Sequence, residues 1–380
     1  MKKICYVLTI PLTVRAFFLP QIRYLASNGF DITVICSPDD TLKSELGDNV
    51  KFVPVEIPRG ISVKKSIQAI HHLTDVFKKE KFDMVQYSTP NAAFYASIAA
   101  KKVKIPVRNY HLMGFRYLGA HGVGRYVLKM IEKITCRNST SIECVSQSNI
   151  ELGYTERLFC KDKACVVWNG STGGVDLKRF DYNKREQWRA DIRAELGYNK
   201  QDFVFGYVGR ITKDKGIDEL LQAYLGLKQT SKLLLIGNIE LEQSLDSELL
   251  RQARENPNIQ FHDAVKDIER YYAAIDVLIL PSYREGFGNV IIEAGAVGTP
   301  AIVSKIPGPV DAIEEGKTAY TVAAKDVSAL ANRMECMTQT DYCEMGKAAA
   351  AFVRTHFDSE ILNQKILERK HKLLQIENNR

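Results

Sequence analysis

The feature that most constrains the fold of this chain is an alternation of short β-branched runs with longer amphipathic stretches, which occurs twice. The first series ends near residue 167 and the second begins near residue 203. Between them, the glycine-rich segment Asn169–Gly174 and a charged stretch that ends at Lys200 interrupt the pattern. Such alternation is typical of parallel α/β sheets, so we predict two doubly wound α/β domains that face each other across a cleft. In such sheets ligands bind beyond the carboxyl ends of the strands.

Apolar runs and their periodicity locate the individual elements. We expect strands at Ile4–Thr9, Asp31–Cys36, Lys51–Val55, Met84–Tyr87, Val107–Tyr110, Ser141–Val145, Ala164–Val167, Phe203–Val208, Lys232–Ile236, Ile259–His262, Asp276–Leu280, Ala301–Val303 and Ala319–Val322. We expect helices at Arg15–Ser27, Ser66–Lys79, Ala92–Lys101, Arg125–Cys136, Ile217–Leu225, Glu240–Glu255, Ile268–Ala274, Asn289–Ala296, Val327–Met337 and Phe357–Gln375. The predicted organisation is an N-terminal domain over residues 1–170, a linker over 171–200, a C-terminal domain over 201–355, and a terminal helix over 356–380 that packs back toward the N-terminal domain.

Composition favours a cytoplasmic protein. The longest apolar runs have the length of a strand, and none approaches the length of a membrane span. The first apolar stretch stops at Pro11, which is too early for a secretory signal. The eight cysteines show no C-x-x-C spacing and lie mostly in apolar or helical stretches, so we expect buried thiols in a reducing compartment.

The net charge of +7 is unevenly distributed along the chain. Residues 1–180 hold 26 Lys and Arg against 15 Asp and Glu, a charge of +11, which leaves −4 for the rest. One interpretation is ordinary surface solubility. The other is an anionic partner for the first half, such as the inner face of a membrane or a lipid pyrophosphate. Nucleic acid is the weakest alternative because the basic residues are scattered and no aromatic-interleaved motif accompanies them.

The first chemically informative motif is Gly206–Gly216, which follows a predicted strand and precedes a helix. Gly209 and Gly216 permit close approach of a ligand to the backbone. Arg210 and Lys215 place two cations at the mouth of that strand, as a pyrophosphate requires. Taken alone, the motif slightly favours a solvated basic turn, because short runs of glycine and basic residues are common.

The second motif begins where a buried strand ends at Pro281 and continues through Glu285 into a predicted helix that starts near Asn289. The backbone N–H groups and the dipole at that helix start make an anion site. Glu293 lies eight residues after Glu285, about two helical turns, so the two carboxylates roughly share a face. Because the helix is nearly apolar, Glu293 needs a partner, and we expect one carboxylate to reach a sugar ring and the other a ribose diol.

Together these residues resemble the retaining glycosyltransferases of family 4, which have the GT-B fold of two Rossmann-like domains. The resemblance covers most of residues 140–355. It implies that Arg210 and Lys215, with Gly209 beside them, bind the diphosphate of a nucleotide-sugar donor. It also implies that the backbone of Gly286, Phe287, Gly288 and Asn289 binds phosphate and sugar, that Glu285 contacts the transferred sugar, and that Glu293 binds the ribose. The base is expected against the stretch corresponding to His262–Lys266, near Val265.

The N-terminal domain matches that family less closely. The loop Thr9–Arg15 lacks the glycine that many members have there, so Thr13 and Arg15 are weaker acceptor-binding candidates. His111 lies where many relatives place a histidine near the sugar, and we include it with Glu285, Lys215 and Arg210 as a catalytic candidate. A capping or core role is the alternative for His111.

The stretch His111–Arg125 resembles a subset of enzymes that act in bacterial O-antigen and capsule assembly. The resemblance implies a lipid-linked acceptor, a saccharide on a polyprenyl diphosphate. Arg116 and Arg125 could then face the acceptor phosphate. The helix over Val123–Ile134 could lie on a membrane surface, although core packing is the alternative that we favour for it.

The predicted reaction is transfer of a sugar with retention, from a UDP-linked N-acetyl or deoxy-amino hexose to that acceptor. The sequence has no Asp-x-Asp pair at a strand end, so we expect neither a metal nor another cofactor. GDP-mannose is the alternative donor. A sugar-nucleotide epimerase or hydrolase of the same fold, or a non-catalytic binding subunit, are the alternative functions. A phosphorylase would need a lysine for pyridoxal phosphate, and the sequence does not identify one.

Overall fold

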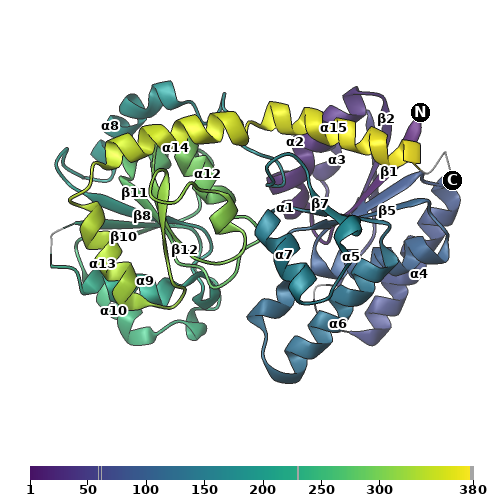
Figure 1. Cartoon of the computed structure of the whole chain (residues 1–380), viewed down its shortest axis with the longest axis horizontal. Helices are drawn as coiled ribbons and strands as arrows, with labels where there is room; N and C mark the ends of the chain where they lie inside the picture. Colours follow the sequence, from purple (N-terminus) through teal and green to yellow (C-terminus); the bar gives the residue numbers. More distant parts are fainter. Residues whose placement is uncertain (59, 61, 229–230, 377–380) are drawn as a thin grey trace. The chain divides into compact units, whose positions relative to one another are not determined.

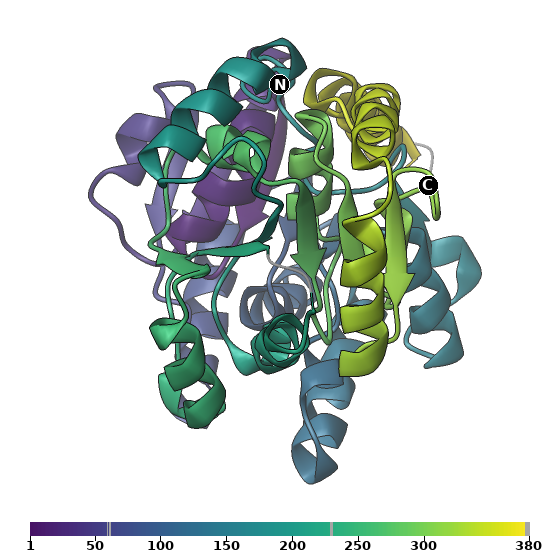
Figure 2. The ribbon, with the colours of Figure 1, turned by 90° about the vertical axis from the view of Figure 1, so that its left-hand side faces the viewer.

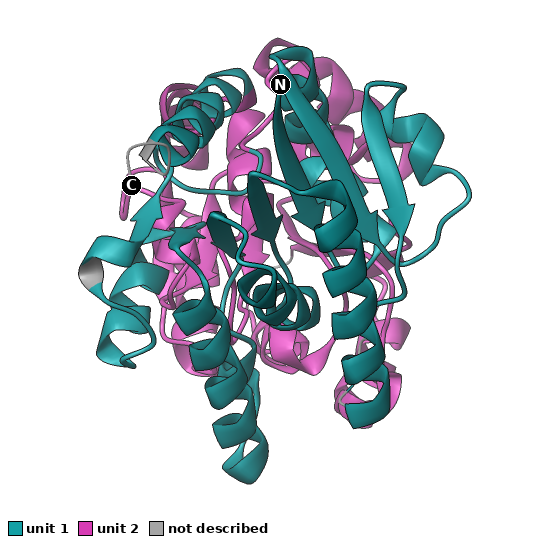
Figure 3. Ribbon diagram, turned by 90° about the vertical axis from the view of Figure 1, so that its right-hand side faces the viewer, with its two compact units in different colours: residues 1–173, 360–380 teal, residues 174–359 magenta. Residues whose placement is uncertain are grey.

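The computed structural model describes residues 1–58, 60, 62–228 and 231–376, and its chain divides into two compact units (Figures 1 and 3). Unit 1 comprises Met1–Gly173 together with Glu360–Arg380, and unit 2 comprises Gly174–Ser359. Where the chain enters and leaves unit 2, Val175 and Asp358 form a parallel bridge. The last four residues of the predicted terminal helix lie outside the described residues.

Unit 1 contains a parallel sheet of seven strands in the order β3-β2-β1-β4-β5-β6-β7. The strands are β1 Lys2–Val7, β2 Phe30–Cys36, β3 Val50–Pro54, β4 Met84–Tyr87, β5 Val107–Leu112, β6 Ser141–Cys144 and β7 Ala164–Val166. The chain winds outward from β1 to β3 and then crosses to the other side of β1 to add β4. The strand order therefore reverses between β1 and β4, where doubly wound sheets bind ligands.

Helices cover both faces of this sheet, so each strand buries side chains in both directions. In β1, Cys5 and Val7 enter one apolar core with α4, α5, α6 and α7, whereas Ile4 and Tyr6 enter another with η1, α2, α3 and α15. The helices are α1 Pro11–Thr13, α2 Leu19–Ser27, α3 Leu42–Leu46, α4 Val63–Glu80, α5 Pro90–Lys102, α6 Gly122–Asn138, α7 Gln147–Thr155 and α15 Ser359–Ile376, with the π-helix η1 Val14–Phe18 and the 3-10 turns η2 Arg116–Gly119 and η3 Lys161–Lys163.

Unit 2 contains a parallel sheet of six strands in the order β10-β9-β8-β11-β12-β13 (Figure 2). The strands are β8 Val204–Val208, β9 Lys232–Ile236, β10 Ile259–His262, β11 Val277–Leu280, β12 Ala301–Ser304 and β13 Ala319–Val322. Its helices are α8 Arg185–Glu195, α9 Ile217–Leu225, α10 Ser247–Glu255, α11 Ile268–Ala274, α12 Asn289–Ala296, α13 Val327–Met337 and α14 Tyr342–His356, with 3-10 turns η4 Tyr182–Lys184, η5 Lys213–Lys215, η6 Glu242–Ser244 and η7 Pro309–Asp311. The strand order reverses between β8 and β11.

The predicted linker contains the helix α8, which is part of unit 2. Arg189 and Arg193 of this helix bond the two carboxylate oxygens of the fully buried Asp276, at 2.5 and 2.7 Å. The Val204 N–H donates a further 2.7 Å bond to the same carboxylate. These bonds satisfy the buried charge and tie α8 to the start of both β8 and β11.

Two predicted helices are interrupted for identifiable reasons. In Arg15–Ser27, Pro20 has no N–H to donate, and the structure forms the π-helix η1 before α2 begins. In Glu240–Glu255, Leu241 has a left-handed φ of 56°, and helix α10 starts only after Asp246. The Asp246 carboxylate accepts bonds from the N–H groups of Glu248 and Leu249, which caps α10.

Two further properties concern the chain as a whole. In the described part of the chain, no helix combines the length and the apolar character needed to span a membrane. Of the cysteines, Cys5, Cys36, Cys136 and Cys144 are buried, whereas Cys160, Cys336 and Cys343 are exposed, so the expectation of buried thiols is wrong for the latter three.

Candidate functional site

The two sequence motifs meet at the point in unit 2 where the strand order reverses. Strands β8 and β11 are neighbours, with Phe205 opposite Val277 and Gly206 opposite Leu278. Because the strands are parallel, the segments that follow them, from Gly209 and from Pro281, leave the sheet at the same edge. This is the edge at which doubly wound sheets bind nucleotides.

Glycine at position 216 brings these two segments into direct contact. A Cβ on Gly216 would lie 2.2 Å from the carbonyl oxygen of Pro281, and the φ of 73° also favours glycine. The N–H of Tyr283 donates to the carbonyl of Asp214 at 3.0 Å. The turn after β8 and the loop after β11 are therefore one structural unit.

Lys215 and Glu285 form the chemical centre of this unit. The Lys215 Nζ lies 2.6 Å from Glu285 Oε1, and the two side chains are only 18% and 14% exposed. The Ser282 hydroxyl donates a second bond to the same carboxylate oxygen, at 2.8 Å. An ammonium has three donors, so Lys215 can hold Glu285 and still donate to phosphate oxygens. The structure thus joins two residues that are 70 positions apart in the sequence.

Asp214 was not among the residues that the sequence identified, yet it fixes this arrangement. Its carboxylate accepts a 2.7 Å bond from the Thr212 hydroxyl and a 2.8 Å ion pair from Arg284. These bonds hold the turn η5 that carries Lys215 against the loop that carries Glu285. Asp214 precedes Lys215 in the first motif, and Arg284 precedes Glu285 in the second. These opposite charges next to the two site residues are the sequence signal that could have identified Asp214.

Arg210 lies in a more exposed position than Lys215. The hydroxyl of Tyr207 donates a 2.7 Å bond to the carbonyl of Arg210, which fixes the backbone of the turn. The guanidinium pairs with Glu240 at 3.1 Å, and both side chains are about half exposed, at 53% and 48%. Exposed pairs of this kind contribute little energy, so the Arg210 side chain can leave Glu240 at small cost.

The loop after Glu285 is shaped by its glycines and leads directly into α12. Gly288, with a φ of 92°, is the N-cap of this helix and has no side chain to cap it. A Cβ on Gly308 would lie 2.7 Å from the Gly286 carbonyl, so the loop after β12 closely supports this turn. The ring of Phe287 is buried against that of Phe357, with centroids 5.3 Å apart. Only the backbone of Phe287 can therefore serve a ligand.

Glu293 is the fifth residue of α12, about one turn from the helix start, and its partner is Tyr272 of α11. The Tyr272 hydroxyl donates a 2.9 Å bond to Glu293 Oε2. Burial raises the pKa of the Glu293 carboxyl above its usual value, while the Tyr272 bond and the charge of Arg179 oppose the rise. Arg179 itself pairs with Glu269 at 2.8 Å and donates to the carbonyl of Lys266. Neither Tyr272 nor Arg179 was identified as a site residue from the sequence.

Val265, the predicted contact for the base, lies in the loop between β10 and α11 and is partly exposed. Strand β9 separates β10 from β8 in the sheet. This loop is tied to its surroundings through the bond from Arg179 to the Lys266 carbonyl and a 3.4 Å bond from the Ala264 N–H to Asn238. Val265 is therefore at the same edge of the sheet as the two motifs.

In unit 1, His111 is buried in β5, next to the buried ion pair of Glu143 and Lys370. Its Nε2 lies 3.4 Å from the Thr172 hydroxyl, and its ring packs edge-on against Phe18 at 5.3 Å. The neighbouring strand places Glu143 opposite His111, and Lys370 of α15 bonds Glu143 at 2.7 Å. Burial lowers the pKa of His111 to about 4, which outweighs the opposing charge of Glu143. The imidazole is therefore neutral near pH 7 and can exchange hydrogen bonds but carries no charge.

The predicted acceptor-binding residues occupy different environments. Arg15 bonds Asp39 and Glu45, each at 2.7 Å at the shortest. Its guanidinium therefore ties η1 to the loop and helix after β2, and its role toward an acceptor stays a prediction. Thr13 ends the short helix α1 and is partly exposed. Arg116 donates one 2.9 Å bond to Asn91 and keeps other donors.

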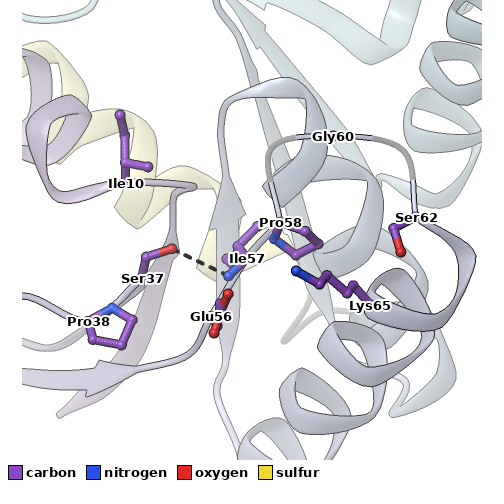
Figure 4. A pocket seen from close by; sticks show the side chains of 9 residues that line it. All are labelled: Ile10, Ser37, Pro38, Glu56, Ile57, Pro58, Gly60, Ser62 and Lys65. Carbon is purple, nitrogen blue, oxygen red and sulfur yellow. Dashed lines mark hydrogen bonds between the residues drawn. The ribbon is translucent and has the colours of Figure 1, made fainter.

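A pocket lies at the carboxyl ends of β1, β2 and β3 in unit 1 (Figure 4). Ser37 connects its walls, because its hydroxyl donates to the Thr9 carbonyl at 2.8 Å and accepts from the Ile57 N–H at 3.4 Å. Asn91 bonds the carbonyl of Pro58 at 2.6 Å, which links the rim of the pocket to Arg116. The lining residues are Ile10, Ser37, Pro38, Glu56, Ile57, Pro58, Gly60, Ser62 and Lys65.

Two family models match this chain. The model described as "Glycosyl transferase 4-like" matches residues 3–146, and the model described as "Glycosyl transferases group 1" matches residues 189–350. A capsular polysaccharide biosynthesis glycosyltransferase, CapM of Staphylococcus aureus, is 31% identical over 349 residues, which are 90% of each chain. A UDP-Gal:α-D-GlcNAc-diphosphoundecaprenol α-1,3-galactosyltransferase of Escherichia coli is 27% identical over 88% of each chain.

Solved structures show the same architecture. A sucrose-phosphate synthase from Thermosynechococcus elongatus superimposes with a TM-score of 0.80 at 19% identity, over 99% of this chain and 100% of that one. The Anabaena HepE protein in complex with UDP superimposes with a TM-score of 0.77 at 19% identity, over 98% and 100%.

The two parallel sheets, each with a reversal of strand order, and the likeness to these structures define a GT-B fold. The chain belongs to the family of glycosyltransferases whose halves match the 4-like and group 1 models, as its likeness to CapM along 90% of both chains shows. The resemblance inferred from the sequence motifs is confirmed, and the chain is a glycosyltransferase.

Proposed function

We propose that this glycosyltransferase moves a sugar, with retention of configuration, from a nucleotide-sugar donor to a saccharide linked to a polyprenyl diphosphate. The donor that we favour is a UDP-linked N-acetyl or deoxy-amino hexose, and the pathway is the assembly of a surface polysaccharide such as a capsule or an O-antigen. The enzyme would act at the cytoplasmic side of the membrane that holds the acceptor.

The names of the relatives support the substrate classes. The E. coli relative is named for a UDP-linked donor and a diphosphoundecaprenol acceptor. A relative in Campylobacter jejuni, 25% identical over 93% of this chain, is named as an N,N'-diacetylbacillosaminyl-diphospho-undecaprenol α-1,3-N-acetylgalactosaminyltransferase. Both names combine a diphosphate lipid with an α-1,3 linkage.

The observation that carries the proposal is the Lys215–Glu285 pair at the strand-order reversal of unit 2. An ammonium beside a helix N-terminus suits a diphosphate. A carboxylate in the same place suits the hydroxyls of a sugar. One site therefore offers a partner for each half of a nucleotide sugar.

The proposed mechanism assigns charge stabilisation to the protein and no covalent role. As the bond between the anomeric carbon and the diphosphate oxygen breaks, negative charge grows on the diphosphate. Lys215, Arg210 and the N-terminus of α12 stabilise that charge. The acceptor hydroxyl attacks the face from which the diphosphate departs, which retains the configuration. Glu285 orients the sugar, and His111 of unit 1, being neutral, would act only as a hydrogen-bonding group.

In unit 1, we propose that the pocket after β1, β2 and β3 receives the acceptor saccharide. It offers the hydroxyls of Ser37 and Ser62 and the carboxylate of Glu56 for sugar hydroxyls. Lys65, with Arg116 near the rim, offers cations for the lipid diphosphate.

The test is a screen of UDP- and GDP-sugars with a GlcNAc-diphospho-lipid analogue, with EDTA in parallel. We expect one UDP-sugar to be consumed, an α-linked product by NMR, and no loss of turnover in EDTA. Formation of a β-linked product would contradict retention. Rapid formation of an epimer or free sugar from the donor alone would favour the epimerase or hydrolase instead. Preference for GDP-mannose would overturn the donor assignment.

Glu293 gives a pH-dependent prediction for donor binding. If its carboxylate accepts the ribose hydroxyls, the affinity for UDP should fall as the pH drops through the raised pKa of Glu293, because the protonated form loses acceptors. Glu293→Gln should bind UDP roughly tenfold more weakly at pH 8 and should lack this pH dependence. Calorimetric titration of both proteins between pH 5 and pH 8 measures it, and parallel pH profiles would contradict the ribose role.

A further inference from the structure

One face of helix α6 carries an apolar surface that no described residue of the chain covers. Val123, Tyr126, Val127, Met130 and Ile134 are 80%, 67%, 39%, 39% and 38% exposed. Their spacing of three, four and seven residues places them on one side of the helix. The favoured prediction of core packing for this helix is therefore wrong for these side chains. We call this set the α6 stripe.

The opposite face of α6 attaches the helix to unit 1. Glu132, Thr135 and Cys136 are buried there, and Cys136 belongs to the apolar core that α5 shares. Figure 1 shows α6 beside α5 at the outside of the unit. The α6 stripe is thus the solvent-facing side of a helix whose opposite side is buried in unit 1.

The charges around the α6 stripe have one sign. Lys133 and Arg137 are exposed and lie at the edge of the stripe by helical spacing. On the inner side, Arg125 and Lys129 pair with Glu156. The only acid of the helix, Glu132, is buried, and burial raises the pKa of its carboxyl to about 7. The outward face of α6 therefore combines apolar side chains with cations and presents no carboxylate.

The charge of unit 1 as a whole has the same sign. Unit 1 holds 29 Lys and Arg against 17 Asp and Glu, a charge of +12, whereas unit 2 holds 23 against 28, a charge of −5, within the total of +7. A basic surface is attracted to anionic lipid headgroups, and the attraction falls off within a Debye length. An apolar stripe bordered by Lys and Arg is the pattern of a helix that lies in the interface of a bilayer.

We propose that the α6 stripe docks unit 1 on an anionic lipid bilayer, with the five apolar side chains inserted among the acyl chains and with Lys133 and Arg137 at the headgroups. The proposal deepens the proposed function and rests on it in one respect. A docked unit 1 can take its polyprenyl-linked acceptor directly from the membrane.

The first experiment measures binding without any substrate. Vesicles of phosphatidylcholine with 30 mol% phosphatidylglycerol are floated with the full chain at low salt. We expect the wild type to float with these vesicles, and to float far less with pure phosphatidylcholine or in 0.5 M NaCl. Equal binding to both vesicle types, or no binding at low salt, would overturn the proposal.

Variants then assign the surface. Val123→Asp with Met130→Asp should reduce vesicle partition at least tenfold, and Lys133→Glu with Arg137→Glu by at least as much, since each cation is worth about fivefold. Leu241→Asp is the matched control, because Leu241 is an exposed apolar residue of unit 2, 65% exposed, and should change nothing. All these residues are exposed, so an unchanged melting temperature shows that the variants fold. Undiminished flotation of the α6 variants would overturn the assignment.

Two further readouts separate the possible failures. With a short-chain, water-soluble acceptor analogue, the α6 variants should transfer sugar as fast as the wild type, and with the acceptor in vesicles they should be at least tenfold slower. If no lipid diphosphate serves as acceptor, the proposed function is wrong. The flotation result still tests membrane docking in that case, because that experiment uses no substrate. If gel filtration shows a wild-type dimer that Val123→Asp with Met130→Asp makes monomeric, without vesicle binding, the stripe is a contact between copies and the docking proposal is wrong.

Discussion

Replacing Lys215 with alanine is expected to lower kcat for sugar transfer by roughly 100- to 1,000-fold, the loss that follows removal of one positioned donor to a developing anion. The ammonium contacts Glu285 at 2.6 Å. Its removal takes one cation from the leaving diphosphate and also leaves the Glu285 carboxylate unneutralised beside it. Initial rates with saturating donor and acceptor measure the effect.

Lys213 provides the matched control, because it lies on the same 3-10 turn η5 and its side chain is exposed. Each variant removes one lysine from the same turn. Because the Lys213 side chain is exposed and takes no part in the Lys215–Glu285 pair, Lys213→Ala should leave kcat within about twofold. Lys215→Ala should retain the melting temperature of the wild type to within a few degrees. Near-normal turnover of folded Lys215→Ala would remove Lys215 from the proposed machinery.

Replacing Lys370 with methionine is expected to destabilise the protein by about 3 kcal/mol, near the lower end of the cost of removing one partner of a buried ion pair, because Arg369 Nε still lies 3.5 Å from Glu143 Oε1. Lys370 is fully buried and bonds Glu143 Oε2 and Gln86 Oε1, each at 2.7 Å. Burial alone would raise the pKa of Glu143, but the charge and bond of Lys370 outweigh it and lower that pKa. Urea unfolding measures the change.

A second substitution distinguishes the ion pair from packing. Lys370→Met combined with Glu143→Met removes both charges, so it should restore most of the lost stability. If the double variant is as unstable as the single one, the long side chain of Lys370 matters for its volume and not for its charge. Lys365→Met is the control, since Lys365 lies on the same helix α15 with an exposed side chain, and should cost less than about 0.5 kcal/mol.

The fold could be predicted wherever periodicity was strong. The predicted bounds of β4, β9, β10 and β13 agree with the structure residue by residue, as do those of α9, α11, α12 and α13. In these segments apolar residues mark a buried strand or one face of a helix, and the pattern ends at a turn.

Helices α1, α3, α7, α8 and α14 are not among the predicted elements, and α8 lacks a clear apolar face. Helix α8 is largely charged and follows a glycine-rich segment, so its composition resembles a linker, and its anchors are the arginines that reach Asp276. Helix α14 packs on α12 and does have the helical period, since Glu344, Lys347 and Arg354 are exposed and Met345, Ala349 and Val353 are buried. Its absence from the predicted elements is an error of the prediction that the sequence pattern does not explain.

The sequence predicted which residues form the candidate site, but it did not predict the contacts between them. Glycines, cations and carboxylates at strand ends identified the two motifs of unit 2. The sequence could not show that Gly216 contacts Pro281, or that Lys215 bonds Glu285, because both depend on β8 and β11 being neighbours. The sequence also could not show that Arg15 is paired with carboxylates, because its partners Asp39 and Glu45 come from the loop and helix after β2.

The central claim is that unit 2 binds the donor diphosphate through Lys215. The most direct test is calorimetric titration of UDP, with GDP in parallel, into the wild type, Lys215→Ala and Lys213→Ala at pH 8. We predict equal affinity of the wild type and Lys213→Ala for UDP, and at least tenfold weaker binding by Lys215→Ala. Equal binding of UDP by all three proteins would contradict the claim.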